Sequence, residues 1–175
     1  ILTTSTQYLN RQLLPSNKFI YGYFPSFHAT MTSYNILRHT GTAWSMICAY
    51  EVTEDDSLIK TVNQSLFFFF SQVVQKDEDT AFIVEEKTNE IKLGGNGIAI
   101  ITLSKHMEVF GDVDFTELIC KLANGILSLQ DKATGKMTHV LNADDFEVKE
   151  EFRTVYYDGE SSYALIRAYD ICGDV

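Results

Sequence analysis

Hydrophobic residues recur at helical spacing in three separate segments of the chain. Trp44, Ile47, Cys48 and Val52 fall near positions i, i+3, i+4 and i+8, so they would share one face of a helix. The later two segments end in glycine followed by aspartate, and glycine readily takes the left-handed conformation that stops a helix. The pattern therefore predicts three helices, over residues 41–55, 97–112 and 160–174.

The three predicted helices align as copies of one repeat. When the segments are matched at Asp55, Asp112 and Asp174, which lie 57 and 62 residues apart, the preceding hydrophobic and acidic positions also correspond. Self-similarity at such a period indicates a repeat architecture, in which each copy is one supersecondary unit.

A second helix is expected after each of the first two copies. These helices would cover about residues 57–74 and 114–130, with Ser57 and Asp114 at their amino-terminal caps. The amino-terminal segment is interpreted as the second helix of an earlier repeat. We therefore expect residues 1–175 to form a single domain of about three helical hairpins, which starts and stops in mid-repeat as a fragment of a larger array would.

Long non-helical connections link the predicted hairpins. Each opens with an alternating patch rich in aromatic or β-branched residues, at residues 18–23, 81–84 and 136–140. Such patches are typical of short strands, and long connections inside a compact domain are usually functional or disordered. Their aromatic content argues against disorder, so we expect short β arms between the hairpins.

The order of helix, tight Gly-Asp turn, helix and long aromatic arm, at a period near 60 residues, resembles the α/α-toroid superfamily. That group includes the six-hairpin glycosidases, the glucosamine 2-epimerase-like enzymes and the lanthionine-synthetase C-like proteins. The resemblance covers nearly the whole chain and implies a mainly α fold of tandem helical hairpins that form part of an α/α-toroid. It also implies a central cavity ringed by the first helix of each hairpin. Six or so hairpins close such a ring, so either a further segment or a second chain in a homodimer would complete it.

Polar residues occupy one equivalent position where each arm enters its helix. His39, Asn96 and Asp158 coincide in the alignment, and Arg38 comes directly before the first of them. Helix amino termini offer unpaired N–H donors and a positive dipole end. Three different polar groups at equivalent points of a ring could converge on one ligand.

A saccharide suits this set of side chains, because sugars need alternating donors and acceptors together with a flat aromatic face. The predicted catalytic residues are Asp158, Glu160 and His39, and the predicted ligand-binding residues are Arg38, Asn35, Asn96, Tyr34, Tyr156 and Tyr157. A second interpretation gives the same residues structural roles. Asn96 and Asp158 would then cap their helices, and His39 would be a hydrogen-bonded histidine at a packed helix start.

The leading functional hypothesis is a carbohydrate-active domain that binds a saccharide at these helix starts, as a glycoside hydrolase or a sugar epimerase. The alternative is a non-catalytic helical-repeat module that binds a peptide or protein, so whether the chain is an enzyme stays open. Residues 142–160 carry seven acidic residues against Lys149 and Arg153. They are interpreted either as a solvated loop or as a lid over the cavity, held by Arg153.

Charge and cysteine content narrow the possible partners. The formal net charge of −10 argues against nucleic acid and anionic membranes, because phosphates would be repelled. Cys48, Cys120 and Cys172 are few and dispersed, so they are expected to be small buried side chains rather than a disulfide framework. Their spacing does not match a zinc site, and we expect no metal and no cofactor. This cysteine usage is compatible with the cytoplasm, but the compartment stays open.

Overall fold

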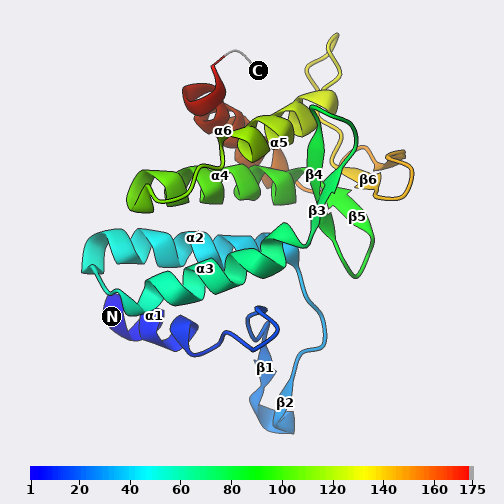
Figure 1. Cartoon of the computed structure of the whole chain (residues 1–175). Helices are drawn as coiled ribbons and strands as arrows, with labels where there is room; N and C mark the ends of the chain where they lie inside the picture. Colours follow the sequence, from blue (N-terminus) through cyan, green and yellow to red (C-terminus); the bar gives the residue numbers. More distant parts are fainter. Residues whose placement is uncertain (174–175) are drawn as a thin grey trace. The chain divides into compact units, whose positions relative to one another are not determined.

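The computed structural model describes residues 1–173 (Figure 1). The predicted contribution of Asp174 to the last helix stop lies outside these residues. The chain divides into two compact units, Ile1–Ser71 and Gln72–Val175. This division falls between two of the predicted repeats, and the single repeat domain expected from the sequence stays a prediction.

Unit 1 consists of three helices and one small β-hairpin. Helices α2 (Ile36–Thr53) and α3 (Ser57–Phe70) lie antiparallel and side by side, and α1 (Leu2–Asn10) packs against both. Their shared core includes Met46, Ile47, Leu58, Val62 and Phe69. The hairpin pairs β1 (Tyr23–Phe24) with β2 (Ala29–Thr30) around the short 3₁₀ helix η1 (Pro25–Phe27).

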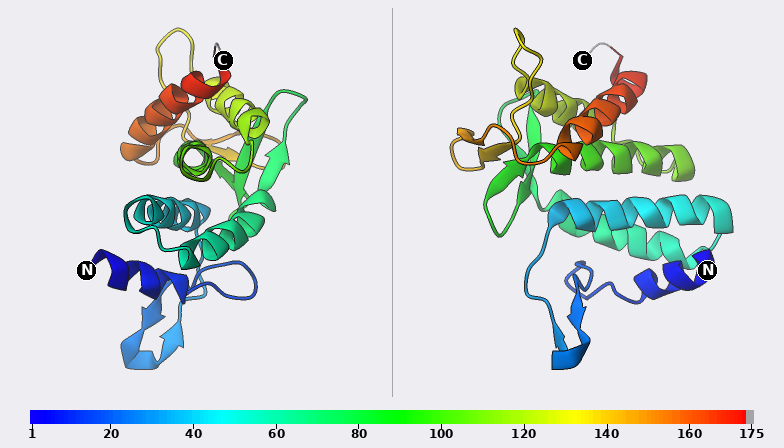
Figure 2. Two further views of the ribbon diagram at one scale, coloured as in Figure 1. Left: turned by 60° about the vertical axis from the view of Figure 1, so that its left-hand side comes forward. Right: turned by 180° about the vertical axis from the view of Figure 1, so that it is seen from behind.

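Unit 2 combines three helices with one five-stranded sheet. Helices α4 (Leu93–Phe110), α5 (Thr116–Ser128) and α6 (Tyr156–Cys172) pack against one another (Figure 2). The antiparallel sheet has the order β3-β4-β5-β6-β7, with strands β3 (Val73–Gln75), β4 (Ala81–Glu85), β5 (Glu90–Lys92), β6 (Val140–Asn142) and β7 (Val148–Glu150). The arms of two repeats therefore join into a single sheet. Gly125 lets this sheet approach α5, because a Cβ there would lie 2.4 Å from the Ala81 carbonyl oxygen.

The first helices of the three repeats, α2, α4 and α6, end at equivalent positions. Their C-caps are Glu54, Gly111 and Gly173, which have the same 57- and 62-residue spacing as the aspartates that anchored the alignment. All three caps have positive φ, at 52°, 65° and 75°. Glu54 and Gly111 have the left-handed conformation that ends a helix, whereas Gly173 has a different ψ of −141°. The structure thus confirms the repeat register that the sequence predicted.

Several predicted helix starts are wrong by a few residues. Asn96 and Asp158 lie inside the first turns of α4 and α6, so neither is an N-cap. Asp114 precedes α5 by two residues, and its carboxylate accepts a hydrogen bond from the Thr116 backbone N–H at 2.9 Å. Ser57 lies within α3, whose N-cap is Asp56. Local side-chain hydrogen bonds before a helix shift its start, and these are hard to read from spacing alone.

The expectation that the cysteines are small buried side chains is wrong for all three, and two of them form a disulfide. Cys120 of α5 and Cys172 of α6 form a disulfide although 52 residues separate them. Packing of α5 against α6 brings their Cα atoms to 5.9 Å, within the range that a disulfide spans. All three cysteines are partly exposed rather than buried. Within residues 1–173, no helix is long and apolar enough to cross a membrane.

Candidate functional site

His39 is buried in unit 1 and joins three elements. Its Nε2 lies 2.9 Å from the Ser65 carbonyl oxygen, which can only accept, so the proton sits on Nε2 and the Nδ1 atom accepts from the Tyr34 hydroxyl at 2.6 Å. Burial lowers the pKa of His39 to about 4, because a charged imidazolium would lose its solvation. The side chain is therefore a neutral link between α2, α3 and the preceding arm.

The neighbouring residues of unit 1 also have partners within that unit. Asn35 is the N-cap of α2, and its Oδ1 accepts from the Arg38 backbone N–H at 3.1 Å. Arg38 is exposed, and its guanidinium donates to the Tyr21 hydroxyl at 2.8 Å. Ligand binding by these side chains, with Tyr34 and His39, stays a prediction.

Asn96 connects the sheet of unit 2 to helix α4. It is completely buried, and its Oδ1 accepts from the Ile83 backbone N–H at 2.8 Å, while its amide donates to the Lys92 carbonyl at 2.9 Å. A buried amide must find such partners, because an unpaired polar group is costly away from water. The position equivalent to His39 therefore again joins a first helix to its preceding arm.

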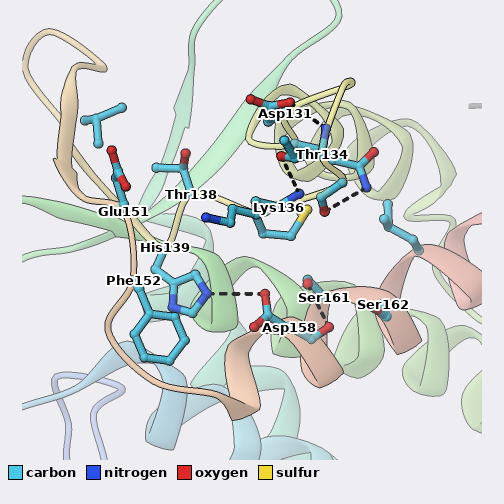
Figure 3. A pocket seen from close by; sticks show the side chains of 15 residues that line it. Asp131, Thr134, Lys136, Thr138, His139, Glu151, Phe152, Asp158, Ser161 and Ser162 are labelled. Carbon is cyan, nitrogen blue, oxygen red and sulfur yellow. Dashed lines mark hydrogen bonds and ion pairs between the residues drawn. The ribbon is translucent and has the colours of Figure 1, made fainter.

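Asp158 occupies the third equivalent position, and its partner is a histidine that the sequence interpretation did not select. His139 is buried, and its Nδ1 accepts from the backbone N–H groups of Arg153 at 2.9 Å and Thr154 at 3.3 Å. The ring proton must then sit on Nε2, which donates to Asp158 Oδ1 at 3.2 Å (Figure 3). The Asp158 side chain remains 46% exposed. His139 thus orients a carboxylate that solvent or a ligand can reach.

A pocket of about 920 Å³ opens in front of this carboxylate. Its wall comes from the first half of α6, the turn around residues 130–139 and the segment that follows β7. The polar lining includes the hydroxyls of Thr134, Thr138, Ser161 and Ser162 together with Lys136. Phe152 adds an exposed aromatic ring, whose centroid lies 4.7 Å from that of His139. The pocket therefore combines hydroxyls, the Lys136 ammonium, an aromatic face and three carboxylates, those of Asp131, Glu151 and Asp158.

A network of charges anchors the segment beside the pocket. Buried Glu90 accepts from Arg153 at 3.0 Å and pairs with Lys149 at 2.8 Å and with Lys92 at 3.3 Å. Burial opposes the charge of Glu90, but hydrogen bonds from Arg153 and the lysines outweigh it and hold the pKa of this carboxyl well below its usual range. Arg153 also binds Glu150 at 2.6 Å. The acidic segment is thus held by Arg153; a lid function stays a prediction.

Glu160 faces α4 and does not line the pocket. Its buried Oε2 has no hydrogen-bond partner among residues 1–173 and lies close to Gly94, where an added Cβ would come within 2.4 Å of it. Burial raises the pKa of Glu160 to about 6. The adjacent Tyr157 is buried, whereas Tyr156 is exposed. Of the three predicted catalytic residues, Asp158 lines the pocket of unit 2.

His139 was not among the predicted site residues, because its partner Asp158 lies 19 residues further along the chain. The available signal was its place in the alternating patch of residues 136–140, which ends where β6 begins. A single cavity lined by the predicted site residues of both units stays a prediction.

Comparison with known proteins identifies the architecture. No protein-family model and no curated protein matches the sequence. Among solved structures, a sugar epimerase from a ruminal bacterium matches with a TM-score of 0.70 at 14% identity, over 99% of this chain and 51% of that chain. This chain has the fold of part of an α/α-toroid.

Two further solved structures agree with the toroid fold. The cellobiose 2-epimerase from Bacillus thermoamylovorans has a TM-score of 0.72 at 12% identity, over 96% of this chain and 48% of that chain. A family 105 glycoside hydrolase from C. acetobutylicum has a TM-score of 0.63 at 12% identity, over 98% and 47%. The chain spans about half the length of the solved structures that it matches. It is therefore a toroid segment by fold, and these identities are too low to carry more than the fold.

Proposed function

We propose that this toroid segment is carbohydrate-active and binds a saccharide in the pocket of unit 2, with Asp158 as the central ligand to the sugar. The observation that carries the proposal is the pair of His139 and Asp158, in which a buried ring holds a reachable carboxylate at a helix start. The similar solved structures, which include sugar epimerases and a glycoside hydrolase, support the substrate class.

The lining suits a sugar for physical reasons. Hydroxyl groups of a sugar donate and accept, so they pair with carboxylates, with serine and threonine hydroxyls and with a lysine ammonium. A sugar ring also has an apolar face that packs on an exposed aromatic ring. Phe152 offers such a ring, and Ser161 and Ser162 lie on the same helix as Asp158.

Asp158 is also the best candidate for a proton acceptor in this proposal. Its Oδ1 accepts from His139, so the second carboxylate oxygen is the one that can accept a proton from a bound sugar. His139 has both ring nitrogens engaged, so it positions Asp158 and does not exchange the proton itself. Glu160 faces α4 outside the pocket, so it does not supply a proton to the sugar in this proposal. Hydrolysis and epimerisation are both compatible with Asp158 as the acceptor.

The test is calorimetric titration of the chain with glucose, mannose and cellobiose. We expect Asp158→Asn to weaken saccharide binding by about tenfold or more, because a charge-assisted hydrogen bond contributes roughly 1.5–3 kcal/mol. Asp144→Asn is the matched control, because Asp144 is an exposed aspartate outside the pocket. Equal affinities for the two variants, or no binding of any saccharide by the wild type, would reject the proposal in favour of a peptide- or protein-binding module.

A further inference from the structure

The β1–β2 hairpin of unit 1 exposes large apolar side chains on one face. Phe24, Phe27 and Met31 are 47%, 79% and 37% exposed. Phe24 pairs with Ala29 across the hairpin, and Met31 follows Ala29 by two residues, so it lies on the same face. The Phe27 ring meets that of Phe24 edge to face, with centroids 6.5 Å apart. Exposed apolar side chains that cluster in this way indicate an interaction surface, which we call the hairpin face.

Two cations lie at the base of the hairpin. The exposed Arg38 guanidinium donates to the Tyr21 hydroxyl at 2.8 Å and lies 5.3 Å from the centroid of the Tyr21 ring. A guanidinium has five N–H donors, and this hydrogen bond uses one of them. The Lys18 ammonium lies 4.4 Å from the centroid of the Phe68 ring. The base of the hairpin is therefore positively charged and offers the donors that bind carboxylates.

The acidic residues of the chain are distributed away from this hairpin. Residues 1–50 contain Arg11, Lys18 and Arg38 but no aspartate or glutamate, and all 24 acidic residues lie in residues 51–175. Those of unit 1 lie in residues 51–56, where α2 turns into α3. Helix α2 has 18 residues and is about 27 Å long, and the hairpin precedes its other end (Figure 2). Unit 1 is therefore basic at the hairpin and acidic at the α2–α3 turn.

This charge distribution decides the chemistry of a partner. At physiological salt, charges are screened beyond about 8 Å, so the acidic turn of unit 1 does not cancel the attraction of Arg38 and Lys18 for carboxylates. The hairpin face also needs apolar groups to cover it, and an acidic polysaccharide has no apolar side chains. A flat anionic membrane would meet the whole chain, whose net charge of −10 it repels. An acidic peptide with interspersed apolar residues satisfies both requirements, and aromatic residues and arginine are enriched in such interfaces.

We propose that the hairpin of unit 1 is a docking surface for an acidic peptide segment of a partner protein. Apolar side chains of the peptide pack on Phe24, Phe27 and Met31, and its carboxylates pair with Arg38 and Lys18. This surface uses no residue of the pocket in unit 2, so the proposal does not rest on saccharide binding. Its test contains no sugar, and the two proposals therefore fail independently.

Calorimetric titration of the whole chain with a random copolymer of glutamate and tyrosine tests the docking surface. We expect the wild type to bind, and Phe27→Ala to weaken binding about tenfold, because an aromatic side chain that the peptide buries is lost. Arg38→Gln should also weaken binding and reduce its dependence on salt, since one screened ion pair is removed. Phe67→Ala is the matched control, because Phe67 is an exposed phenylalanine on α3, 65% exposed against 79% for Phe27, and it should bind as the wild type does.

Two further titrations, with polygalacturonate and with phosphatidylserine vesicles, separate a peptide from the other anionic partners. We expect both to bind more weakly than the copolymer. Polygalacturonate or vesicles that bind as tightly as the copolymer would overturn the choice of a peptide in favour of that partner. No binding of the copolymer by the wild type, or equal losses in Phe27→Ala and Phe67→Ala, would overturn the docking surface itself.

Discussion

Helices α2 and α6 occupy the same place in the repeat, yet the polar side chains near their amino-terminal ends differ in exposure. His39 of α2 is buried and uses both ring nitrogens within unit 1. Asp158 of α6 stands at the equivalent position, uses one carboxylate oxygen on His139 and stays half exposed in a pocket. The same repeat position thus holds a buried, fully hydrogen-bonded side chain in unit 1 and a half-exposed carboxylate in unit 2. The partner that each arm supplies makes the difference.

The carboxyl-terminal ends of the two helices differ as well. Cys172 links the end of α6 to α5 through a disulfide, whereas the equivalent residue of α2 is Thr53, whose hydroxyl donates to the Ala49 carbonyl of the same helix. The helix that presents a half-exposed group at one end is therefore covalently held at the other.

Removing the disulfide between Cys120 and Cys172 should have the largest effect on the free energy of unfolding. Closing a loop of 52 residues restricts the unfolded chain, so Cys172→Ala should lower the free energy of unfolding by about 4 kcal/mol. Urea unfolding followed by circular dichroism measures the loss, and dithiothreitol should bring the wild type to the level of the variant. Cys48→Ala is the control and should respond to the reductant as the wild type does. Equal stabilities with and without reductant would show that the disulfide does not stabilise unit 2.

His39, near the amino-terminal end of α2, should have the next largest effect, which appears as a pH dependence of the free energy of unfolding. Folded His39 has a pKa of about 4 and the unfolded residue one of 6.5, so between these values the unfolded chain binds the extra proton. The free energy of unfolding should therefore fall by about 3 kcal/mol as the pH drops from 6.5 to 4. His39→Phe preserves an aromatic ring beside Phe68 and should remove this contribution. The contribution of His106, whose pKa burial also lowers, should remain in the variant. A variant with an unchanged pH profile would contradict the neutral, buried state of His39.

The repeat register and the helix caps differ in how well the sequence predicts them. Repeat register and helix ends were predictable, because glycine caps and apolar spacing are local signals that survive in each copy. His39, Asn96 and Asp158 all lie near the start of their helices, as the fourth, fourth and third residues, but Asn96 and Asp158 are not the caps that one interpretation expected. Caps depend on one or two local hydrogen bonds, such as that of Asp114, which spacing does not reveal.

Features that depend on long-range packing were not predictable. Cys120 and Cys172 meet only because α5 and α6 pack side by side, and neither helix shows this in its own sequence. The same applies to His139, whose partners come from a turn and a later helix. The β arms were expected one by one, but their pairing into one sheet required strands from different repeats to find each other.

Glu160 should have the smallest effect on the pH dependence of the free energy of unfolding, and its sign should be opposite to that of His39. Its folded pKa of about 6 lies above the ordinary value of 4.5, because burial disfavours the carboxylate, so the folded chain holds the extra proton between these values. The free energy of unfolding should then rise as the pH falls from 6 to 4.5, by on the order of 1 kcal/mol after allowance for solvent screening at a partly exposed side chain. Glu160→Gln should remove this rise, so that the fall due to His39 becomes steeper in the variant than in the wild type. Unfolding curves of both proteins between pH 4 and 7 measure the difference, with Glu151→Gln as the control. A variant whose profile is flatter than that of the wild type would show that Glu160 is ionised in the folded chain and would contradict its raised pKa.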